Sequence, residues 1–311
     1  MPSSSSTLRI GTRGSQLARW QANWVANRLR ALHSGLEVVL VEIKTEGDRD
    51  RNTPLAAIGG QGLFTKEIQR ALLDSTVEVA VHSLKDLPTQ GPDALTLGAV
   101  PAREESADAL IAPVHRTLDA LPEAATVGTG SLRRRAQLLH LRPDLNVVGI
   151  RGNVETRLNQ ALEGKLDAVV LAEAGLRRLG FDGHITERLG PPRFLPAVGQ
   201  GALGIECRAD DANTLARLAP LNDAATRRAV LAERRALAEL EGGCMIPLAA
   251  WGRDSADGQL CLDIALFDPD GREQLFAALS GPADDPEGLG LHVAQQLRQK
   301  GADRILAQVR R

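Results

Sequence analysis

The sequence predicts an α/β fold made of two successive strand-and-helix units, followed by a smaller α+β unit. The chain has 311 residues, of which 43% are hydrophobic, so it can build two or three separate cores. Strand and helix patterns alternate up to residue 101 and again in the residues up to 196, which is typical of mostly parallel sheets. After residue 220 the pattern changes to a long helix, two strand pairs and a final helix.

Local periodicity predicts the elements of the first unit. Strands are expected at 8–10, 36–44 and 77–81, and helices at 17–32 and 65–73, with Thr65 as an N-cap. The expected apolar face of the first helix consists of Leu17, Trp20, Trp24, Leu29 and Leu32. The stretch 45–62 is polar and lacks periodicity. Because a loop of that length is usually disordered or functional, we interpret it as a candidate lid.

The later units are predicted in the same way. In the second unit, strands are expected at 126–128, 146–150 and 167–172, and helices at 131–141 and 154–163. Prolines interrupt the pattern at 191–196, and 202–207 is expected to be a strand that returns to the first unit. The third unit combines helices at 224–240 and 286–300 with hairpin turns at Asp257-Gly258 and Asp270-Gly271.

Composition excludes several classes of protein. The net charge of −2 disfavours a general nucleic-acid binder, and no run of about eighteen apolar residues predicts a membrane span. The opening residues 1–6 lack the basic and apolar segments of a secretory signal, and the three cysteines are too few for a disulfide framework. No Cys or His spacing is typical of zinc. We therefore expect a cytoplasmic protein with reduced thiols and no metal.

Basic and hydroxyl side chains recur at the ends of the predicted strands. The chain has 37 lysines and arginines, of which only five are lysines. A GC-rich genome explains part of this bias, but arginine also binds planar carboxylates with two parallel hydrogen bonds. Ligands of open α/β sheets bind beyond the carboxyl ends of the strands, near helix N-termini that attract anions. Two such edges facing each other would form an anion-binding cleft, and the residues at these positions are Arg13, Ser15, Ser83, Lys85, Thr129, Ser131, Arg133, Arg134, Arg151, Arg157 and Arg178.

Two further residues have side chains that could take part in a reaction. Asp86 follows Ser83 and Lys85 in one strand-end loop. It either pairs with a neighbouring arginine or serves the reaction by stabilising a positive charge or moving a proton. Cys244 follows two glycines in a loop, where a thiol is suited to nucleophilic attachment, although no histidine adjoins it. Cys207 and Cys261 lie in apolar, strand-like segments and are expected to be buried.

Seven stretches, at 8–18, 59–67, 79–88, 127–137, 151–158, 195–208 and 241–247, resemble the porphobilinogen deaminase family, and five of them contain highly specific motifs. The motifs are HSLKDLP (82–88), VGTGSLRRR (127–135), RGNVETRL (151–158), AVGQGALGIECR (197–208) and EGGC (241–244). The resemblance extends over nearly the whole chain, in family order. It implies two α/β domains like those of type II periplasmic binding proteins with a hinge between them, at 7–101 plus 197–219 and at 102–196. A smaller α+β domain at 220–311 would carry Cys244.

The resemblance also implies an activity. The family's enzyme is a transferase that deaminates porphobilinogen and joins four units head to tail, releasing hydroxymethylbilane for tetrapyrrole (haem) biosynthesis. A dipyrromethane cofactor would be attached through a thioether to Cys244. The resemblance further implies a monomer, with the product passed to uroporphyrinogen-III synthase.

The family's functional residues match positions already singled out, together with two others. Asp86 would be catalytic, stabilising the positive charge shared with the pyrrole nitrogens. The cofactor-binding matches are Cys244, Lys85, Ser83, Thr129, Ser131, Arg133, Arg134 and Asp86. The substrate-binding matches are Arg13, Ser15, Phe64, Arg151, Arg157, Arg178 and Gln200. Family members often carry lysine in place of Gln61, some carry lysine in place of Ala57, and serine is common in place of Gly130.

Two alternatives remain at this point. A two-lobed solute-binding or sensor protein would share the sheets and the anion cleft, but it would not need Cys244. A nucleic-acid-binding module built on residues 132–135 is disfavoured by the acidic balance and by an aromatic content of only 3%. Intact mass separates the first alternative from the enzyme, because only the enzyme carries a bound dipyrromethane.

Overall fold

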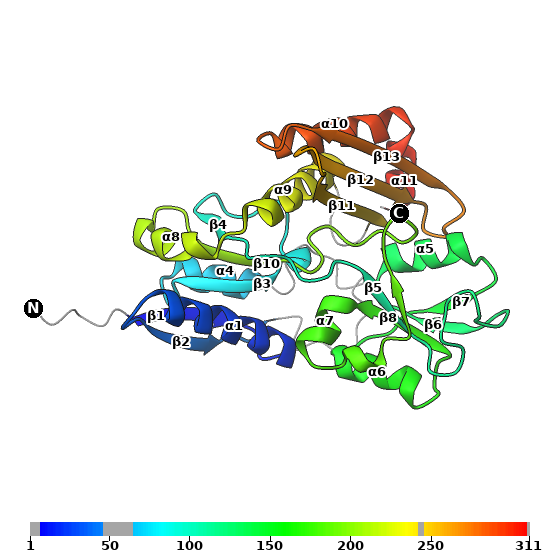
Figure 1. Cartoon of the computed structure of the whole chain (residues 1–311), viewed down its shortest axis with the longest axis horizontal. Coiled ribbons are helices and arrows are strands. Elements are labelled where there is room, and N and C mark those ends of the chain that lie inside the picture. Colours follow the sequence, from blue (N-terminus) through cyan, green and yellow to red (C-terminus); the bar gives the residue numbers. More distant parts are fainter. Residues whose placement is uncertain (1–6, 46–64, 242–245, 310–311) are drawn as a thin grey trace, which may run out of the picture. The chain divides into compact units, whose positions relative to one another are not determined.

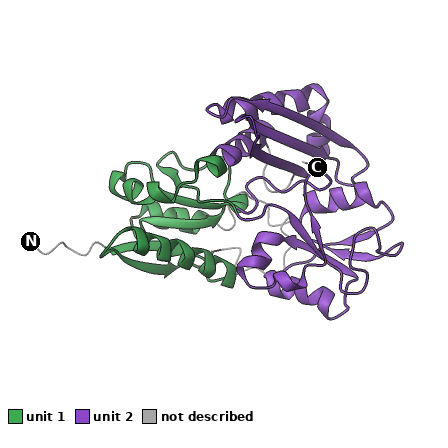
Figure 2. Cartoon of the chain, viewed as in Figure 1, with its two compact units in different colours: residues 1–103, 202–227 green, residues 104–201, 228–311 purple. Residues whose placement is uncertain are grey.

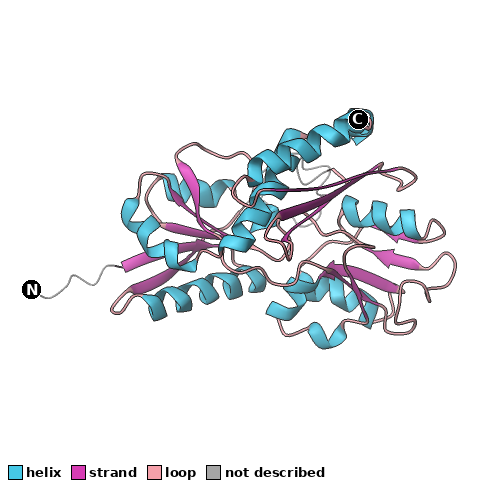
Figure 3. Cartoon of the chain, turned by 45° about the horizontal axis from the view of Figure 1, so that its top comes forward, coloured by secondary structure: helices cyan, strands magenta, loops and turns pink. Residues whose placement is uncertain are grey.

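The computed structural model describes residues 7–45, 65–241 and 246–309, which form helices and three β-sheets (Figure 1). The chain divides into two compact units, one made of residues 1–103 and 202–227 and the other of residues 104–201 and 228–311 (Figure 2). Helices accompany the strands of each sheet (Figure 3). The predicted α/β class, with two larger sheets and a smaller C-terminal sheet, is confirmed.

The sheet of the first unit has the strand order β2-β1-β3-β10-β4. The strands are β1 (Thr7–Thr12), β2 (Glu37–Glu42), β3 (Val79–Ser83), β4 (Leu95–Ala99) and β10 (Leu203–Arg208). Strand β1 pairs in parallel with β2 and β3, whereas β10 runs antiparallel to β3 and β4. The helices of this unit are α1 (Gln16–Leu32), α4 (Lys66–Leu73) and α8 (Ala212–Leu218), and η1 (Leu84–Asp86) and η3 (Ala219–Leu221) are single 3₁₀ turns.

Helix α1 places small residues against the sheet. Its buried apolar residues are Ala22, Val25, Ala26 and Leu29. Trp20 is 37% exposed and Leu32 is 48% exposed, so the predicted apolar face was wrong at these two positions. The alanines let the helix backbone approach the strands closely, which leaves the bulkier side chains towards the rim.

The second five-stranded sheet has the order β7-β6-β8-β5-β9. Its strands are β5 (Asp108–Ile111), β6 (Thr126–Gly128), β7 (Asn146–Val148), β8 (Ala168–Ala172) and β9 (Glu187–Leu189). Strand β6 is parallel to β7 and β8, and β5 is antiparallel to β8 and β9. The helices are α5 (Leu132–Leu141), α6 (Val154–Leu162) and α7 (Glu173–Arg178), and η2 (Asp182–His184) is a 3₁₀ turn. In both sheets, one antiparallel strand therefore lies between three parallel strands and an edge strand.

The C-terminal sheet is a three-stranded antiparallel meander of β11 (Leu248–Asp254), β12 (Leu260–Phe267) and β13 (Gln274–Gly281). It packs with the helices α9 (Ala224–Glu239), α10 (Pro286–Gln299) and α11 (Ala302–Val309) around one core. Both predicted hairpin turns are confirmed, and Gly258 and Gly271 have φ angles of 80° and 71°. Helix α11 was not predicted.

The C-terminal sheet is also joined to the rest of its unit. Gly271 lies so close to helix α5 that an added Cβ would be 2.2 Å from the Ala136 carbonyl oxygen. The Glu233 carboxylate of α9 is fully buried and accepts hydrogen bonds from two backbone amides, those of Gly199 (2.6 Å) and Gly252 (2.9 Å). One side chain thereby connects the segment before β10 with strand β11.

Two of the three cysteines lie in described strands. Cys207 is fully buried, and burial raises the pKa of its thiol to about 11. Cys261 was expected to be buried but is half-exposed, with its sulfur 3.2 Å from the Ser280 hydroxyl. Its side chain lies on the face of β12 opposite Leu260 and Leu262, which face the core.

Candidate active site

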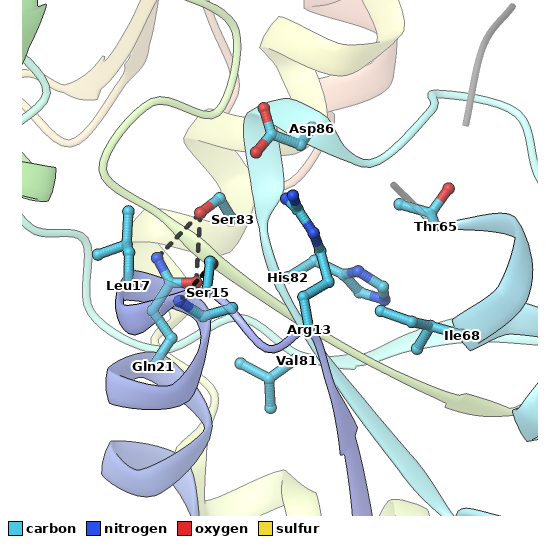
Figure 4. A pocket seen from close by; sticks show the side chains of 11 residues that line it. Arg13, Ser15, Leu17, Gln21, Thr65, Ile68, Val81, His82, Ser83 and Asp86 are labelled. Atoms are coloured by element: carbon cyan, nitrogen blue, oxygen red, sulfur yellow. Dashed lines mark hydrogen bonds between the residues drawn. The ribbon is translucent and has the colours of Figure 1, made fainter. Parts of the chain in front are cut away.

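A pocket of the first unit lies at the carboxyl ends of strands β1 and β3 (Figure 4). Four of the residues predicted from the sequence, Arg13, Ser15, Ser83 and Asp86, meet in it. The other lining residues are Leu17, Ala18, Gln21, Thr65, Ile68, Val81 and His82. The expected clustering at a sheet edge is therefore found in this unit.

Local backbone structure fixes these side chains. Ser15 is the N-cap of α1, and its hydroxyl accepts a hydrogen bond from the Ala18 amide at 3.3 Å. Asp86 ends the 3₁₀ turn η1 directly after β3. Leu84 in this turn is buried, and its amide donates to the Ala202 carbonyl at 3.0 Å. Figure 4 shows the Arg13 side chain extending in the direction of Asp86, so a guanidinium and a carboxylate share the pocket.

Gln21 is a pocket residue that sequence reasoning missed. It is 2% exposed, and its amide exchanges hydrogen bonds with the Ser83 hydroxyl at 2.9 and 3.2 Å (Figure 4). The two residues are 62 positions apart, and a glutamine in a helix has no sequence signal for such a contact. Gln21 therefore holds the Ser83 hydroxyl in a fixed orientation.

A second missed group lies at the same pocket. His82 is 5% exposed, and its Nε2 is 3.1 Å from Oε2 of Glu206 on β10. The other carboxylate oxygen of Glu206 accepts a hydrogen bond of 2.9 Å from Nε2 of Gln69 on α4. His82 and Glu206 both belong to segments of the family resemblance, but neither received a role from the sequence.

In the second unit, the predicted residues gather at the start of helix α5. Ser131 is the N-cap of this helix, and its hydroxyl accepts a hydrogen bond of 3.4 Å from the Arg134 amide. The Thr129 hydroxyl accepts one of 3.3 Å from the Ser131 amide. Gly130 approaches the next strand closely, since an added Cβ would be 2.8 Å from the Ile150 carbonyl oxygen. A serine here would require that backbone to shift, so this departure from the family pattern has local structural consequences.

Arg133 and Arg134 are buried and share one carboxylate, that of Asp108. Arg133 Nη2 lies 2.8 Å from Asp108 Oδ2, and Arg134 Nη2 lies 2.7 Å from Oδ1. Gln200 Nε2 also donates to Oδ1 at 2.9 Å, and Asp108 itself is fully buried. Burial alone would raise the pKa of Asp108, but the charges of the two arginines and the Gln200 hydrogen bond lower it below its ordinary value. Asp108 was not predicted from the sequence.

Three other predicted arginines bind backbone carbonyls or lie near the same edge. Arg178 Nη2 donates to the Gly201 carbonyl at 2.6 Å, and burial lowers the pKa of Arg178 to about 10. Arg157 Nε donates to the Gly152 carbonyl at 2.7 Å. In the part of the chain that the structure describes, Arg151 Nη1 is buried without a hydrogen-bond partner.

Some predicted residues cannot be placed. Cys244 and Phe64 lie outside the described residues, as do Gln61 and Ala57. Lys85 lies half-buried in the turn η1 but is not among the residues that line the pocket. Within residues 7–45, 65–241 and 246–309, no three His, Cys, Asp or Glu side chains form a group that could hold a metal. No described helix has the length and apolar character needed to cross a membrane.

Comparison with known proteins gives the family. Residues 8–216 match the family model "Porphobilinogen deaminase, dipyromethane cofactor binding domain". The chain belongs to the porphobilinogen deaminase family. Residues 227–299 match the family's C-terminal domain. The predicted family, its transferase class and its dipyrromethane cofactor are confirmed by these matches.

Relatives of the family are similar over nearly their whole length. The porphobilinogen deaminase of Syntrophotalea carbinolica is 50% identical over 304 residues, which cover 98% of this chain and 96% of the relative. That of Desulforudis audaxviator is 52% identical over 301 residues and covers 97% of both chains. Among solved structures, the periplasmic aliphatic sulphonate binding protein SsuA from Escherichia coli is 14% identical with a TM-score of 0.38, covering 76% of this chain and 70% of that chain.

Proposed function

We propose that this chain is the hydroxymethylbilane synthase that joins four porphobilinogen units head to tail on a dipyrromethane bound through Cys244, with Asp86 as the catalytic carboxylate. The observation that carries the assignment of Asp86 is its place in a pocket with Arg13, Ser15 and Ser83. These three residues have the chemistry to bind the carboxylates of the substrate. A carboxylate in their midst is suited to the opposite task, which is to stabilise positive charge.

Asp86 would act where charge develops. Loss of ammonia from the aminomethyl group leaves a positive charge that the pyrrole nitrogen shares. A fixed carboxylate near that nitrogen stabilises the charge more than bulk water does, because it needs no reorganisation during the reaction. The turn η1, which the Leu84–Ala202 hydrogen bond attaches to β10, provides this fixed position.

The described residues fit an acidic dipyrromethane. Two guanidinium groups, Arg133 and Arg134, face the single carboxylate of Asp108, so the cluster has an excess of positive charge. In the described chain, Arg133 Nε is buried without a hydrogen-bond partner. We assign Lys85, Ser83, Thr129, Ser131, Arg133 and Arg134 to the acidic side chains of the cofactor, Asp86 to its pyrrole nitrogens, and Cys244 to the thioether. When bound, the dipyrromethane supplies the primer to which substrate units are added.

The remaining predicted residues are assigned to the substrate and the growing chain. Each added unit brings two more carboxylates, so cations are needed over an extended surface. The half-buried Arg151, with its unpartnered Nη1 in the described structure, supports such a role. The proposed substrate-binding residues are Arg13, Ser15, Phe64, Arg151, Arg157, Arg178 and Gln200.

We also propose the domain organisation and the cellular setting. The proposed domains are 7–101 plus 197–219, 102–196, and 220–311. The division of the chain near residues 103 and 201 and the separate C-terminal sheet support them. The enzyme would work as a cytoplasmic monomer and pass its product to uroporphyrinogen-III synthase. Size-exclusion chromatography with light scattering tests the monomer, and a coupled assay with that synthase tests the transfer.

Denatured intact mass combined with an Ehrlich colour test for pyrroles is the most direct test of the function. The purified protein should be heavier than its sequence by one dipyrromethane and should stain for pyrroles. It should also convert porphobilinogen to hydroxymethylbilane. A protein with the mass of its sequence that binds porphobilinogen without converting it would instead be a solute-binding protein.

A further inference from the structure

A chain of three polar side chains lies beneath the Asp86 pocket. It runs from His82 on β3 through Glu206 on β10 to Gln69 on α4. His82 and Glu206 are each 5% exposed, and Gln69 is 8% exposed. Buried polar groups of this kind are costly unless their hydrogen bonds are satisfied. Two strands and one helix of the first unit thus each contribute one side chain to this hydrogen-bonded chain.

The hydrogen bond between His82 and Glu206 indicates one tautomer of the imidazole. The Glu206 carboxylate already receives the Gln69 amide on Oε1, and its Oε2 faces His82 Nε2 at 3.1 Å. An ionised carboxylate only accepts hydrogen bonds, so the imidazole proton belongs on Nε2. The Nδ1 atom then carries a lone pair. His82 lines the pocket together with Asp86, and its ring lies between Arg13 and Ile68 in the view of Figure 4.

This arrangement is that of a general base held by a carboxylate. A base oriented by a third group is the recurrent design for proton transfer in enzymes. Imidazole is more basic than a carboxylate and is the side chain that enzymes most often use as a general base. Asp86 can therefore supply a fixed negative charge while His82 accepts the proton. The pocket therefore holds two groups with separate tasks.

The proposed reaction requires such a proton acceptor. The amine of one unit enters as an ammonium group, and its C–N bond breaks with the electron pair on nitrogen, which leaves as ammonia. The electron pair of a second pyrrole ring forms the new C–C bond at its free α-carbon. That carbon must then lose its hydrogen as a proton, so that the C–H electron pair restores the aromatic ring. The proton can afterwards combine with the released ammonia, which closes the balance as ammonium.

We infer that His82 is a further catalytic residue, which accepts the α-proton on Nδ1, and that Glu206 is the residue that positions it. The imidazolium formed in this step lies against the Glu206 carboxylate, which balances its charge. Gln69 holds the second carboxylate oxygen and keeps Glu206 in place. This inference rests on the proposed function and adds the base that the reaction needs.

Replacing His82 by Gln tests the inference. The glutamine side chain can still donate to Glu206 from a position close to that of Nε2, but it offers no basic nitrogen to the pocket. We expect kcat to fall about 10²- to 10⁴-fold, as for the loss of a general base, with little change in KM. Cofactor content by intact mass should equal that of the parent enzyme. His33→Gln is the matched control, because His33 lies at the far end of α1, about 18 Å of helix beyond the pocket residue Gln21.

A kinetic isotope effect separates proton removal from a structural role. Porphobilinogen deuterated at its free α-carbon loses deuterium whenever the next unit is added to it. In the His82→Gln variant this step should limit the rate, so a normal primary isotope effect should appear that the parent and the His33→Gln control lack. A slow variant without an isotope effect, or one with parental kcat, would overturn the assignment.

The tautomer can be read directly from the parent enzyme. Long-range ¹H–¹⁵N correlation spectra of the six histidines, with the His82 ring assigned through correlations to its own backbone, should show a protonated Nε2 and an unprotonated Nδ1. In Glu206→Gln, the two tautomers should become mixed. Protonation on Nδ1 in the parent would refute the inference even if the variants fail to fold. If the parent itself neither carries a dipyrromethane nor converts porphobilinogen, the proposed function fails instead.

Discussion

Replacing Asp108 by Asn should destabilise the second unit strongly. The substitution keeps the shape of the side chain but removes the only carboxylate that faces Arg133 and Arg134 in the described structure. Asp108 is fully buried, and the side chains of the two arginines are 4% and 7% exposed. Removing one partner of a buried ion pair costs about 3–5 kcal/mol, because the charge that remains is neither paired nor hydrated.

This cost should be visible in the melting temperature. A destabilisation of 1 kcal/mol lowers Tm by about 2–4 °C in a unit of roughly 150–250 residues, so we expect a drop of about 6–20 °C. Differential scanning calorimetry at pH 7 measures it. Asp119→Asn is the control, because Asp119 pairs with Arg193 at the surface, where both side chains are about half-exposed, and such pairs contribute little. A Tm within a degree or two of the parent value would refute the reasoning.

The pH dependence provides an independent check on Asp108. Its pKa is lower in the folded protein than in the unfolded chain, where aspartate titrates near about 3.9. Its stabilisation is therefore fully present above that unfolded value and is lost as the pH falls through the lower folded value. Because asparagine does not titrate, the difference in stability between parent and variant should narrow only below about pH 4. A difference that narrows between pH 7 and 5 would have to come from another group.

Three further predictions concern the proposed site. Cys244→Ser should have the mass of its sequence and lose nearly all activity, since oxygen replaces the thioether sulfur; a fully active variant would contradict the anchor. Asp86→Asn should keep the bound cofactor by intact mass but lower kcat about 10²- to 10⁴-fold, and unchanged kinetics would remove Asp86 from the mechanism. Arg151→Leu should raise KM or stall elongation, which would be visible as the masses of enzyme–intermediate complexes. Arg19→Leu is the control and should do neither, because Arg19 only forms an exposed ion pair with Glu42. A parental product yield from both variants would weaken the assignment of Arg151.

Sequence reasoning succeeded where the signal is local. Strand β3 and the starts of helices α1 and α5 follow from patterns within a few residues, and each begins within two residues of its predicted start. The edge of the sheet then brings Arg13 and Asp86 into one pocket, because both follow strands that pair in parallel. The position of a residue relative to a strand end was therefore sufficient to find this part of the site.

Sequence reasoning failed where the signal is non-local or short. Strands β5 and β9 were not predicted: they have four and three residues, and β5 is buried on both faces, so it shows no alternation of polar and apolar residues. Asp108 begins one of them, and its arginine partners are 25 and 26 positions away. His82 and Glu206 are 124 positions apart. A charged residue in an undetected strand resembles a surface residue until its partners are known, so these buried polar groups could be recognised only in three dimensions.

The Glu233 carboxylate couples the local opening of two segments of the chain. It accepts hydrogen bonds from the backbone amides of both Gly199 and Gly252. Either amide must therefore break its bond to the same carboxylate before it exchanges its hydrogen with solvent. Their hydrogen-exchange rates should rise together in Glu233→Gln, while amides in the middle of β12 keep theirs. The segment that leads into β10 and the first strand of the C-terminal sheet would then open as one cooperative unit, although the two glycines are 53 positions apart in the sequence.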